Sequence, residues 1–424
     1  MTETLRLPEP ESSSNNHRAA SNTTGFRPLD VLILTSDAPP TISGISTCVG
    51  KLVNGLTVRG HRVKVISSAD IPGFTLHELR LSSFLARWPG VARQLGQFDV
   101  VNVHGPVPTM SDVFLRQSPG LPEHDRPAIV YTHHSPVDIR GASRISARYN
   151  RYHDSLVMHA DRIVTSSQHY ADHYYTRYGP LVQVIPWGAE VRSSPPSRPK
   201  SQSGMLNVLF VGQMRPRKGV ETLLAAVAGQ SRLKLTLVGS GAKLGRYKRI
   251  AKRLGATNAQ FLGRLTDEEL QEQYDANDVI VLPSIARAEA FGLVLLEGMA
   301  AGCVPVASDL PGVRQVAGPT GVLVLPGDIA ELRAALVGLA DDNDRLESLQ
   351  ADSWLAAQAL SWERCIDSYQ SALFDAVRSR FAQLHGIAML PEIDRQDPGD
   401  QEAIPAHDGA TGGLHPHVGM RMDR

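Results

Sequence analysis

The sequence predicts an α/β protein made of two doubly wound domains joined by a linker. Short apolar, β-branched runs alternate along the chain with amphipathic stretches, which is the pattern of parallel strands covered by helices. The alternation is interrupted once, by a stretch rich in proline and serine at 192–204, and then starts again. A chain of 424 residues is long enough for two domains that each bury a core.

The part of the chain before this interruption carries six strand-like runs, each apolar at nearly every position. We expect these runs to be buried on both faces of one parallel sheet. They are 31–37, 61–67, 99–105, 128–134, 161–167 and 182–188. Between the first two runs, the stretch 46–60 spaces its apolar residues along one helix face and ends at a glycine, as helices often do.

The part after the interruption repeats the pattern with six more strand-like runs. They are 206–212, 233–239, 259–263, 278–284, 304–309 and 321–327. Helical patterns lie between them, as in "VETLLAAVAG" and "EELQEQYDA", and a longer one follows at 361–385.

These patterns divide the chain into an amino-terminal domain, a linker, a carboxy-terminal domain and a closing helix, at 29–191, 192–204, 205–360 and 361–385. Ligands of doubly wound sheets bind at the carboxyl ends of the strands, so we expect the active site in a cleft between the two domains.

The two ends of the chain differ in composition from the rest. Residues 1–28 and 386–424 are polar and rich in residues that disfavour a core, and we expect a disordered leader and tail. The leader has no apolar segment of the secretory kind. Histidines 407, 415 and 417 fit a solvated tail better than a metal site, because nothing near them would fix a coordination geometry.

Composition argues against several classes of protein. Lys+Arg 43 and Asp+Glu 43 give a net charge of +0, so no overall field attracts nucleic acid. No run approaches the roughly 18 apolar residues that would span a bilayer, although peripheral membrane contact stays open. The three cysteines are scattered and not at metal-ligand spacing, which predicts reduced core thiols and a cytoplasmic protein.

A basic turn follows the first strand of the carboxy-terminal domain. Arg215, Arg217 and Lys218 lie between Gly212 and Gly219, where a helix should begin. Guanidinium and ammonium groups beside free helix amides suit an anion such as a diphosphate. A solvated basic turn is the alternative, and the spacing does not fit a Walker A loop.

Two carboxylates lie eight positions apart in the apolar stretch "ARAEAFGLVLLEGMA". A helix should begin near Gly292, leaving the amides of Phe291, Gly292 and Leu293 free for a phosphate. Glu289 and Glu297 flank this point, and each carboxylate can accept two hydroxyl hydrogen bonds. The arrangement suits a nucleotide sugar; a surface or capping glutamate paired by chance with a loop charge is the alternative.

Taken together, the segments resemble the family-4 retaining glycosyltransferases (glycosyl transferases group 1), over nearly all of residues 29–384. The segments that carry the resemblance are "GISTCVGKLVNGLTVRGHRV", "DVVNVHGP", "YTHHS", "ADRIVTSS", "VIPWGAE", "FVGQMRPRKGVETLLAA", "FLGRLTDEELQEQYDANDVIVLPS", "EAFGLVLLE" and "SDLPGVRQV". The resemblance implies the GT-B fold, in which two Rossmann-like domains face each other across a cleft. The first would hold the acceptor and the second the nucleotide sugar.

The resemblance further implies a hexosyltransferase that acts with retention of anomeric configuration, without a metal ion and without a cofactor, since the nucleotide sugar is a co-substrate. Glu289 would contact the donor sugar hydroxyls, and Lys218 with Arg215 would neutralise the departing diphosphate. His134 matches the histidine that contacts sugar or phosphate, with a backbone-bonded structural histidine as the alternative. Its neighbour His133 should point to the opposite face of the strand, and we expect it to be structural.

Five residues match the family's donor-binding positions. Gly44 would approach donor and acceptor, and Glu297 would contact the ribose. Phe291, Gly292 and Leu293 would offer backbone amides to the diphosphate or the sugar.

Four positions depart from the family pattern. Gln213 stands where arginine is usual, which is why the loop arginine is assigned to Arg215. Ser43, Trp187 and Gln315 replace a glycine, an asparagine and a glutamate that many members carry.

The sequence defines the donor and the acceptor less closely than it defines the class of reaction. Family frequency favours a uridine-diphosphate hexose or N-acetylhexosamine, with guanosine-diphosphate mannose open. The acceptor hydroxyl could belong to a small soluble natural-product aglycone such as an aminocyclitol, as in antibiotic biosynthesis, or to a polysaccharide or glycolipid intermediate. A sugar-nucleotide epimerase of the same architecture and a non-catalytic nucleotide-sugar-binding protein are the alternatives of other classes.

Overall fold

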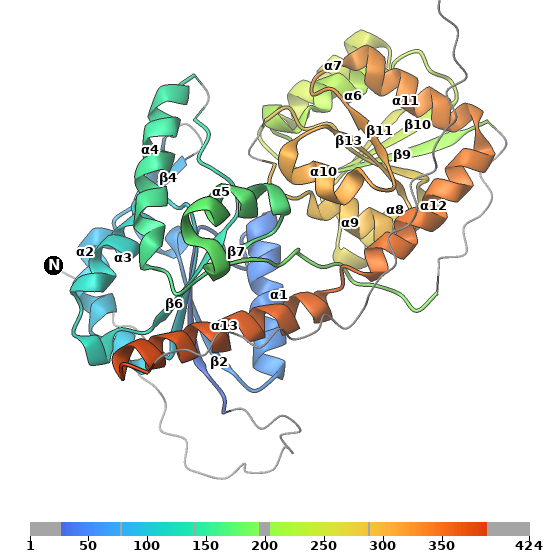
Figure 1. The fold of residues 1–424 in the computed structure, drawn as a ribbon. Helices are drawn as coiled ribbons and strands as arrows, with labels where there is room; N and C mark the ends of the chain where they lie inside the picture. Colours follow the sequence, from blue (N-terminus) through green and yellow to red (C-terminus); the bar gives the residue numbers. More distant parts are fainter. Residues whose placement is uncertain (1–26, 77–78, 140, 195–203, 287–288, 388–424) are drawn as a thin grey trace, which may run out of the picture.

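The computed structural model describes residues 27–76, 79–139, 141–194, 204–286 and 289–387. Two parallel sheets of six strands each, flanked by helices, form two lobes that lie side by side (Figure 1). The predicted two-domain, doubly wound α/β architecture is therefore confirmed. The predicted leader, tail and linker lie almost entirely outside the described residues.

The amino-terminal sheet has the strand order β2-β1-β5-β6-β7-β8. Its strands are β1 Asp30–Thr35, β2 Arg62–Ser67, β5 Val100–Gly105, β6 Ala128–His133, β7 Arg162–Thr165 and β8 Val182–Val184. Its helices are α1 Gly44–Val58, α2 Phe84–Ala92, α3 Ser111–Gln117, α4 Ser143–Leu156 and α5 Gln168–Tyr178. The expectation of complete burial is wrong for β2 and β8, which lie at the sheet edges and are partly exposed.

The carboxy-terminal sheet has the order β11-β10-β9-β12-β13-β14. Its strands are β9 Leu206–Val211, β10 Leu233–Val238, β11 Ala259–Gly263, β12 Val279–Leu282, β13 Val304–Ser308 and β14 Val322–Val324. Its helices are α6 Val220–Val227, α7 Leu244–Leu254, α8 Asp267–Ala276, α9 Leu293–Ala300, α10 Pro311–Ala317, α11 Ile329–Asp341 and α12 Asn343–Gln358. All the predicted parallel strands are present, and each strand is shorter than or equal to its predicted run.

Sequence analysis missed a two-stranded antiparallel hairpin, β3 Gly73–Leu76 and β4 Leu79–Ser82. The twelve predicted strands are continuously apolar runs, which are typical of buried parallel strands. This hairpin alternates polar and apolar residues instead, as in "LRLS", which is the pattern of strands with one face toward solvent.

The last described helix, α13 Trp362–Leu384, returns to the amino-terminal domain and packs on β5, β6, β7 and α1 (Figure 1). At its start the chain crosses the segment that leaves β8: Ala189 bonds by its backbone to Leu360 and Trp362, at 2.9 and 3.2 Å. A single hydrophobic cluster includes residues of both sheets together with α13. The closing helix therefore ties the two domains into one core.

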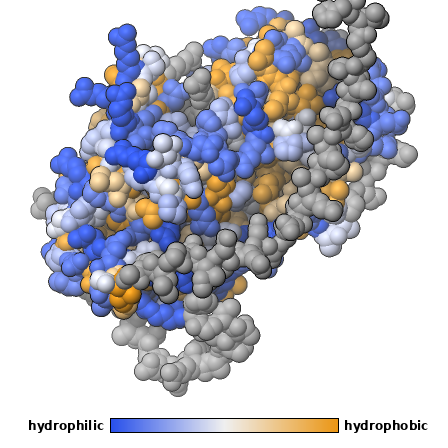
Figure 2. All heavy atoms as spheres, viewed as in Figure 1, coloured by the Kyte–Doolittle hydropathy of each residue, from blue (hydrophilic) through white to orange (hydrophobic). Residues whose placement is uncertain are grey.

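The surface mixes polar and apolar residues. On the face drawn in Figure 2, hydrophilic residues cover most of the amino-terminal lobe, and apolar residues show more widely on the carboxy-terminal lobe. Among the described residues, no helix combines the length and apolar character needed to cross a membrane. The cysteines Cys48, Cys303 and Cys365 are buried and free, as expected.

The crossing at α13 gives a stability prediction. A Cβ added at Gly188 would lie 2.3 Å from the backbone nitrogen of Trp362, so Gly188→Ala should lower the free energy of unfolding by about 1–3 kcal/mol through overpacking. Gly338→Ala is the matched control, because that helical glycine has open space around it and should gain up to about 1 kcal/mol from helix propensity. Urea unfolding measures both, and equal stabilities would show that the crossing is not tightly packed.

Candidate active site at the junction of the two domains

Lys218 and Glu289, which come from different loops of the carboxy-terminal domain, form an ion pair. Lys218 ends the short 3-10 turn that follows β9, and Glu289 precedes α9. Lys218 Nζ lies 2.5 Å from Glu289 Oε2, and the Ser284 hydroxyl donates to the same oxygen at 2.8 Å. The side chains of the pair are only 18 % and 16 % exposed. The structure thus brings together the two residues that the sequence placed at the donor site.

The turn that carries Lys218 is held against the loop after β12 by a glycine. Gly219 has a φ of 67°, and an added Cβ would lie 1.8 Å from the Pro283 carbonyl oxygen. Any other residue would force the two loops apart. The backbone amide of Ile285 donates to the Arg217 carbonyl at 2.8 Å and fixes the same contact.

The charges around Glu289 explain its protonation state. Burial acts to raise the pKa of this carboxyl group, but the charge and hydrogen bond of Lys218, the Ser284 hydrogen bond and the charge of Arg217 outweigh it. The pKa of Glu289 is therefore below its ordinary value, and the side chain is a carboxylate at neutral pH. The carboxylate can accept hydrogen bonds from hydroxyl groups once the Lys218 ammonium group pairs with another anion.

Glu297 lies on α9 beyond this pair and has a different environment. Its Oε2 accepts a hydrogen bond of 2.6 Å from the Tyr274 hydroxyl of α8. Burial raises the pKa of Glu297, and the Tyr274 hydrogen bond only partly offsets it. Nothing in the sequence around Tyr274 identifies it as the partner of Glu297, because the contact depends on how α8 packs on α9.

The start of α9 meets the amino-terminal domain. Gly292 caps the helix with a φ of 85°, and Leu293 is its first residue. A Cβ added at Gly44, where α1 begins, would lie 3.7 Å from Leu293 Cδ1. In the described part of the chain the amides of Phe291, Gly292 and Leu293 donate no hydrogen bond. Four of the five predicted donor-binding residues, Gly44 and 291–293, therefore lie together at a helix start whose first amides are unpaired.

Two hydrogen bonds join the domains at this junction. Gln213 Nε2 donates to the Ile42 carbonyl at 2.8 Å, and the backbone amide of Gln168 donates to Gln315 Oε1 at 2.7 Å. Gln213 and Gln315 are two of the positions at which the sequence departs from the expected family pattern, and here their neutral side chains join the domains.

Arg215 and His134, the other two predicted catalytic residues, have surroundings that differ from those of the Lys218–Glu289 pair. The side chain of Arg215 is half-buried and forms no hydrogen bond or ion pair with the described residues, although its backbone shapes the turn before Lys218. His134 is buried; its Nε2 lies 3.0 Å from His104 Nδ1, and its ring stacks on Trp187. Burial lowers the pKa of His134 to about 4, so its ring is neutral at physiological pH.

The register of the sheet explains the contact between His104 and His134, which sequence analysis missed. In the β5–β6 pair Gly105 lies opposite His133, and the amide of His134 bonds to the Gly105 carbonyl at 2.9 Å. His104 and His134 therefore occupy adjacent strand ends. Their spacing in the sequence carries no signal of this, because the strand order is a tertiary property.

Two facing Rossmann-like domains, with a lysine–glutamate pair beside an open helix start, define the class of GT-B glycosyltransferases. Residues 42–192 match the family model described as Glycosyltransferase Family 4, and residues 196–352 match the one described as Glycosyl transferases group 1. The chain belongs to this family of glycosyltransferases.

Individual proteins agree with this assignment. The D-rhamnosyltransferase WbpZ of Pseudomonas aeruginosa is 30 % identical over 338 residues, which are 73 % of this chain and 86 % of that protein. A D-inositol 3-phosphate glycosyltransferase of Geodermatophilus obscurus is 29 % identical over 377 residues, 80 % of this chain and 78 % of that protein. The crystal structure of HepE of Anabaena in complex with UDP superposes with a TM-score of 0.63 at 18 % identity, over 82 % of this chain and 100 % of that one, and supports the fold.

The ion pair predicts a pH-dependent stability effect. Replacement of Lys218 by methionine leaves the Glu289 carboxylate shielded without its cation, which should cost about 2–3 kcal/mol at pH 7. Because the pKa of Glu289 is lowered in the folded protein, the wild-type advantage is full above the ordinary value of 4.5 and is lost as the pH falls through the lower folded value. Urea titrations from pH 3.5 to 7 measure this difference.

Arg246→Met is the control for this experiment, since Arg246 pairs with Glu221 on the surface of the same domain, with both side chains about half exposed. Its effect should stay below about 1 kcal/mol. A Lys218→Met difference that is the same at pH 3.5 and pH 7 would contradict the assigned charge of Glu289.

Proposed function

We propose that the protein is a metal-independent, retaining hexosyltransferase that moves a hexosyl or N-acetylhexosaminyl group from a UDP-sugar to a hydroxyl group of a small polyol acceptor. The Lys218–Glu289 pair at the start of α9 is the observation that carries this proposal. It offers a cation, a carboxylate and unpaired helix amides at one point of the domain junction.

The pair is suited to an exchange of partners when the donor binds. The diphosphate would draw the ammonium group of Lys218 and accept hydrogen bonds from the open amides of α9. The carboxylate of Glu289, released from its lysine but still bonded to Ser284, would accept hydrogen bonds from the donor sugar. Glu297 would hold the ribose with the carboxylate oxygen that Tyr274 leaves unbonded.

Charge stabilisation is the main chemical task of this site. As the anomeric carbon–oxygen bond breaks, its electron pair goes to the diphosphate oxygen, and Lys218 with the helix amides stabilises that charge as it develops. The acceptor oxygen then forms a bond to the anomeric carbon on the face that the diphosphate leaves, and its proton passes to the diphosphate oxygen. This front-face course retains the anomeric configuration.

Two of the comparisons support the choice of substrates. HepE was crystallised with UDP, and one relative is named for D-inositol 3-phosphate, a cyclitol. A UDP-sugar donor and a cyclitol-like acceptor, such as an aminocyclitol in antibiotic biosynthesis, are the substrates we propose. Polysaccharide and glycolipid acceptors belong in the same screen, because the acceptor side of the site is formed by the amino-terminal domain.

Removal of either member of the pair should abolish most of the activity. Lys218→Ala and Glu289→Gln should each lower kcat at least ~100-fold, since each removes a group that acts on the reacting part of the donor. Release of UDP from UDP-glucose with a polyol acceptor measures the rate, and NMR of the product gives its anomeric configuration. Arg246→Ala is the control and should keep the wild-type rate.

Other outcomes of this assay would point to other functions. Conversion of the donor to its epimer without an acceptor would indicate an epimerase. Donor binding with no turnover on any acceptor, including glycan and glycolipid acceptors, would indicate a binding protein. Wild-type rates in both variants would remove the pair from the active site.

Chelation gives a separate prediction. Because Lys218 and the α9 amides supply the positive charge that a metal ion supplies in other transferases, excess EDTA should change the initial rate by less than about twofold. A rate that collapses in EDTA and returns with added Mn²⁺ or Mg²⁺ would contradict the metal-independent mechanism.

A further inference from the structure

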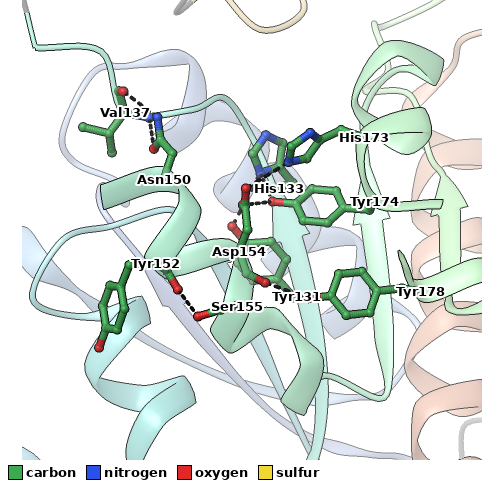
Figure 3. Close-up of polar contacts among 10 residues, drawn as sticks. All are labelled: Tyr131, His133, Val137, Asn150, Tyr152, Asp154, Ser155, His173, Tyr174 and Tyr178. Atoms are coloured by element: carbon green, nitrogen blue, oxygen red, sulfur yellow. Dashed lines mark hydrogen bonds and ion pairs between the residues drawn. The ribbon is translucent and has the colours of Figure 1, made fainter. Parts of the chain in front are cut away.

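A chain of hydrogen-bonded polar side chains joins α4, α5 and the end of β6 (Figure 3). The Tyr174 hydroxyl of α5 donates to Asp154 Oδ1 at 3.0 Å and lies 3.0 Å from His133 Nδ1. The other carboxylate oxygen of Asp154 lies 2.9 Å from His173 Nε2. The chain His173–Asp154–Tyr174–His133 thus runs from the surface to a histidine that is 4 % exposed.

The protons along this chain fix the tautomer of His133. Burial acts to raise the pKa of Asp154, but its hydrogen bonds to His173 and Tyr174 and the charge of His173 outweigh it, so the group is a carboxylate that can only accept. The single proton of Tyr174 is therefore given to Asp154. The Tyr174 oxygen, 3.0 Å from His133 Nδ1 and nearer than the Tyr131 hydroxyl at 3.5 Å, accepts from that nitrogen. Burial also lowers the pKa of His133 to about 3, so the ring is neutral. Its Nε2 then carries a lone pair.

This nitrogen keeps some contact with solvent. His133 Nε2 has no hydrogen-bond partner among the described residues, and it is not one of their fully buried unpaired atoms. The same holds for the hydroxyl of Tyr170, a residue that is only 7 % exposed. The two rings lie 5.0 Å apart. Two neighbouring rings of an otherwise buried setting therefore carry an acceptor nitrogen and a donor hydroxyl that no described residue uses.

His133 and Tyr170 lie on elements that end or begin at the domain junction. His133 ends β6, and ligands of doubly wound sheets bind at the carboxyl ends of strands. Tyr170 lies in the first turn of α5, where Gln168 bonds across the junction to Gln315. Burial and the charge of Glu289 raise the pKa of Tyr170 to about 12, so this hydroxyl keeps its proton and can donate it to a hydrogen bond.

We propose that His133 Nε2 and the Tyr170 hydroxyl form a subsite that binds two neighbouring hydroxyl groups of the acceptor, and that Tyr174 and Asp154 orient His133 for this task. The proposal rests on the proposed transferase function and assigns its acceptor side. His133 accepts a hydrogen bond from one hydroxyl, and Tyr170 donates to the next. A cyclitol or another vicinal diol presents this pair of groups. His133, which sequence analysis assigned to structure, then becomes a binding residue, and Tyr174 and Asp154 are positioning residues.

The test uses the full-length protein labelled with ¹⁵N at histidine. The wild-type spectrum should show His133 with its proton on Nδ1. Titration with myo-inositol or glycerol in the presence of UDP should shift the Nε2 signal. In Tyr170→Phe, which removes one oxygen atom, the polyol concentration at half-shift should rise about tenfold, the loss expected for one good hydrogen bond. In Tyr174→Phe, His133 should lose its single tautomer.

Tyr178→Phe is the matched control. This tyrosine lies on the same helix, and its hydroxyl donates to the Asp154 backbone carbonyl at 2.7 Å without contacting His133. It removes an internal hydrogen bond and should lower the melting temperature at least as much as Tyr170→Phe, yet leave polyol binding and the His133 tautomer unchanged. A purely structural role of Tyr170 would make the two variants indistinguishable in the polyol titration.

The outcomes separate the two proposals. A wild-type Nε2 signal unmoved by either polyol, or equal half-shift concentrations in Tyr170→Phe and Tyr178→Phe, would overturn the acceptor subsite. Failure of the proposed function would give a different result. UDP-glucose would then not raise the melting temperature of the wild-type protein, independently of the outcome of the polyol titration. A Tyr170→Phe variant that loses UDP-glucose stabilisation instead of polyol binding would also overturn the subsite.

Discussion

The close approach of two loops, the turn after β9 and the segment after β12, is the constraint on which the site depends. Gly219 makes it possible, since a side chain there would collide with the Pro283 carbonyl. The approach places an ammonium group against a carboxylate where both are shielded from water, so each is held in position before any ligand arrives. A site of this kind does not have to reorganise its dipoles during the reaction, which is how preorganised charge lowers a barrier.

The residues proposed to bind the donor belong mainly to the carboxy-terminal domain, and the amino-terminal domain meets them at the domain junction. The polar contacts described across it are two hydrogen bonds between uncharged groups, and helix α5 also packs on α10 there. Hydrogen bonds between uncharged groups exchange readily with water and contribute little net free energy. The hydrophobic cluster that includes α13 carries the larger share of the cohesion between domains.

The sequence was sufficient for the strands of the two parallel sheets, the helix at Gly292 and the grouping of Lys218 with Glu289, because periodicity and the turn residues are local signals. It was not sufficient for three side-chain hydrogen bonds near the site, since each joins elements whose adjacency depends on strand order and helix packing. These are the bonds of Tyr274 to Glu297, of His104 to His134 and of Tyr174 to His133. The β3–β4 hairpin was missed because its alternating pattern differs from that of the buried strands. The alternation of faces along β6 did separate His133 from His134, but it could not show that the side chain of His133 would reach solvent.

The return of α13 to the amino-terminal sheet has a consequence for biosynthesis. Tyr369 stacks on Trp187, and the helix covers β5, β6 and β7 beside α1, so this part of the first sheet stays uncovered until the ribosome has completed the second domain. Domains generally fold as they emerge, in order from the amino terminus. Here the apolar surface of the first lobe stays uncovered until α13, the last of the described helices, has been translated. This interval is a natural point for chaperone binding.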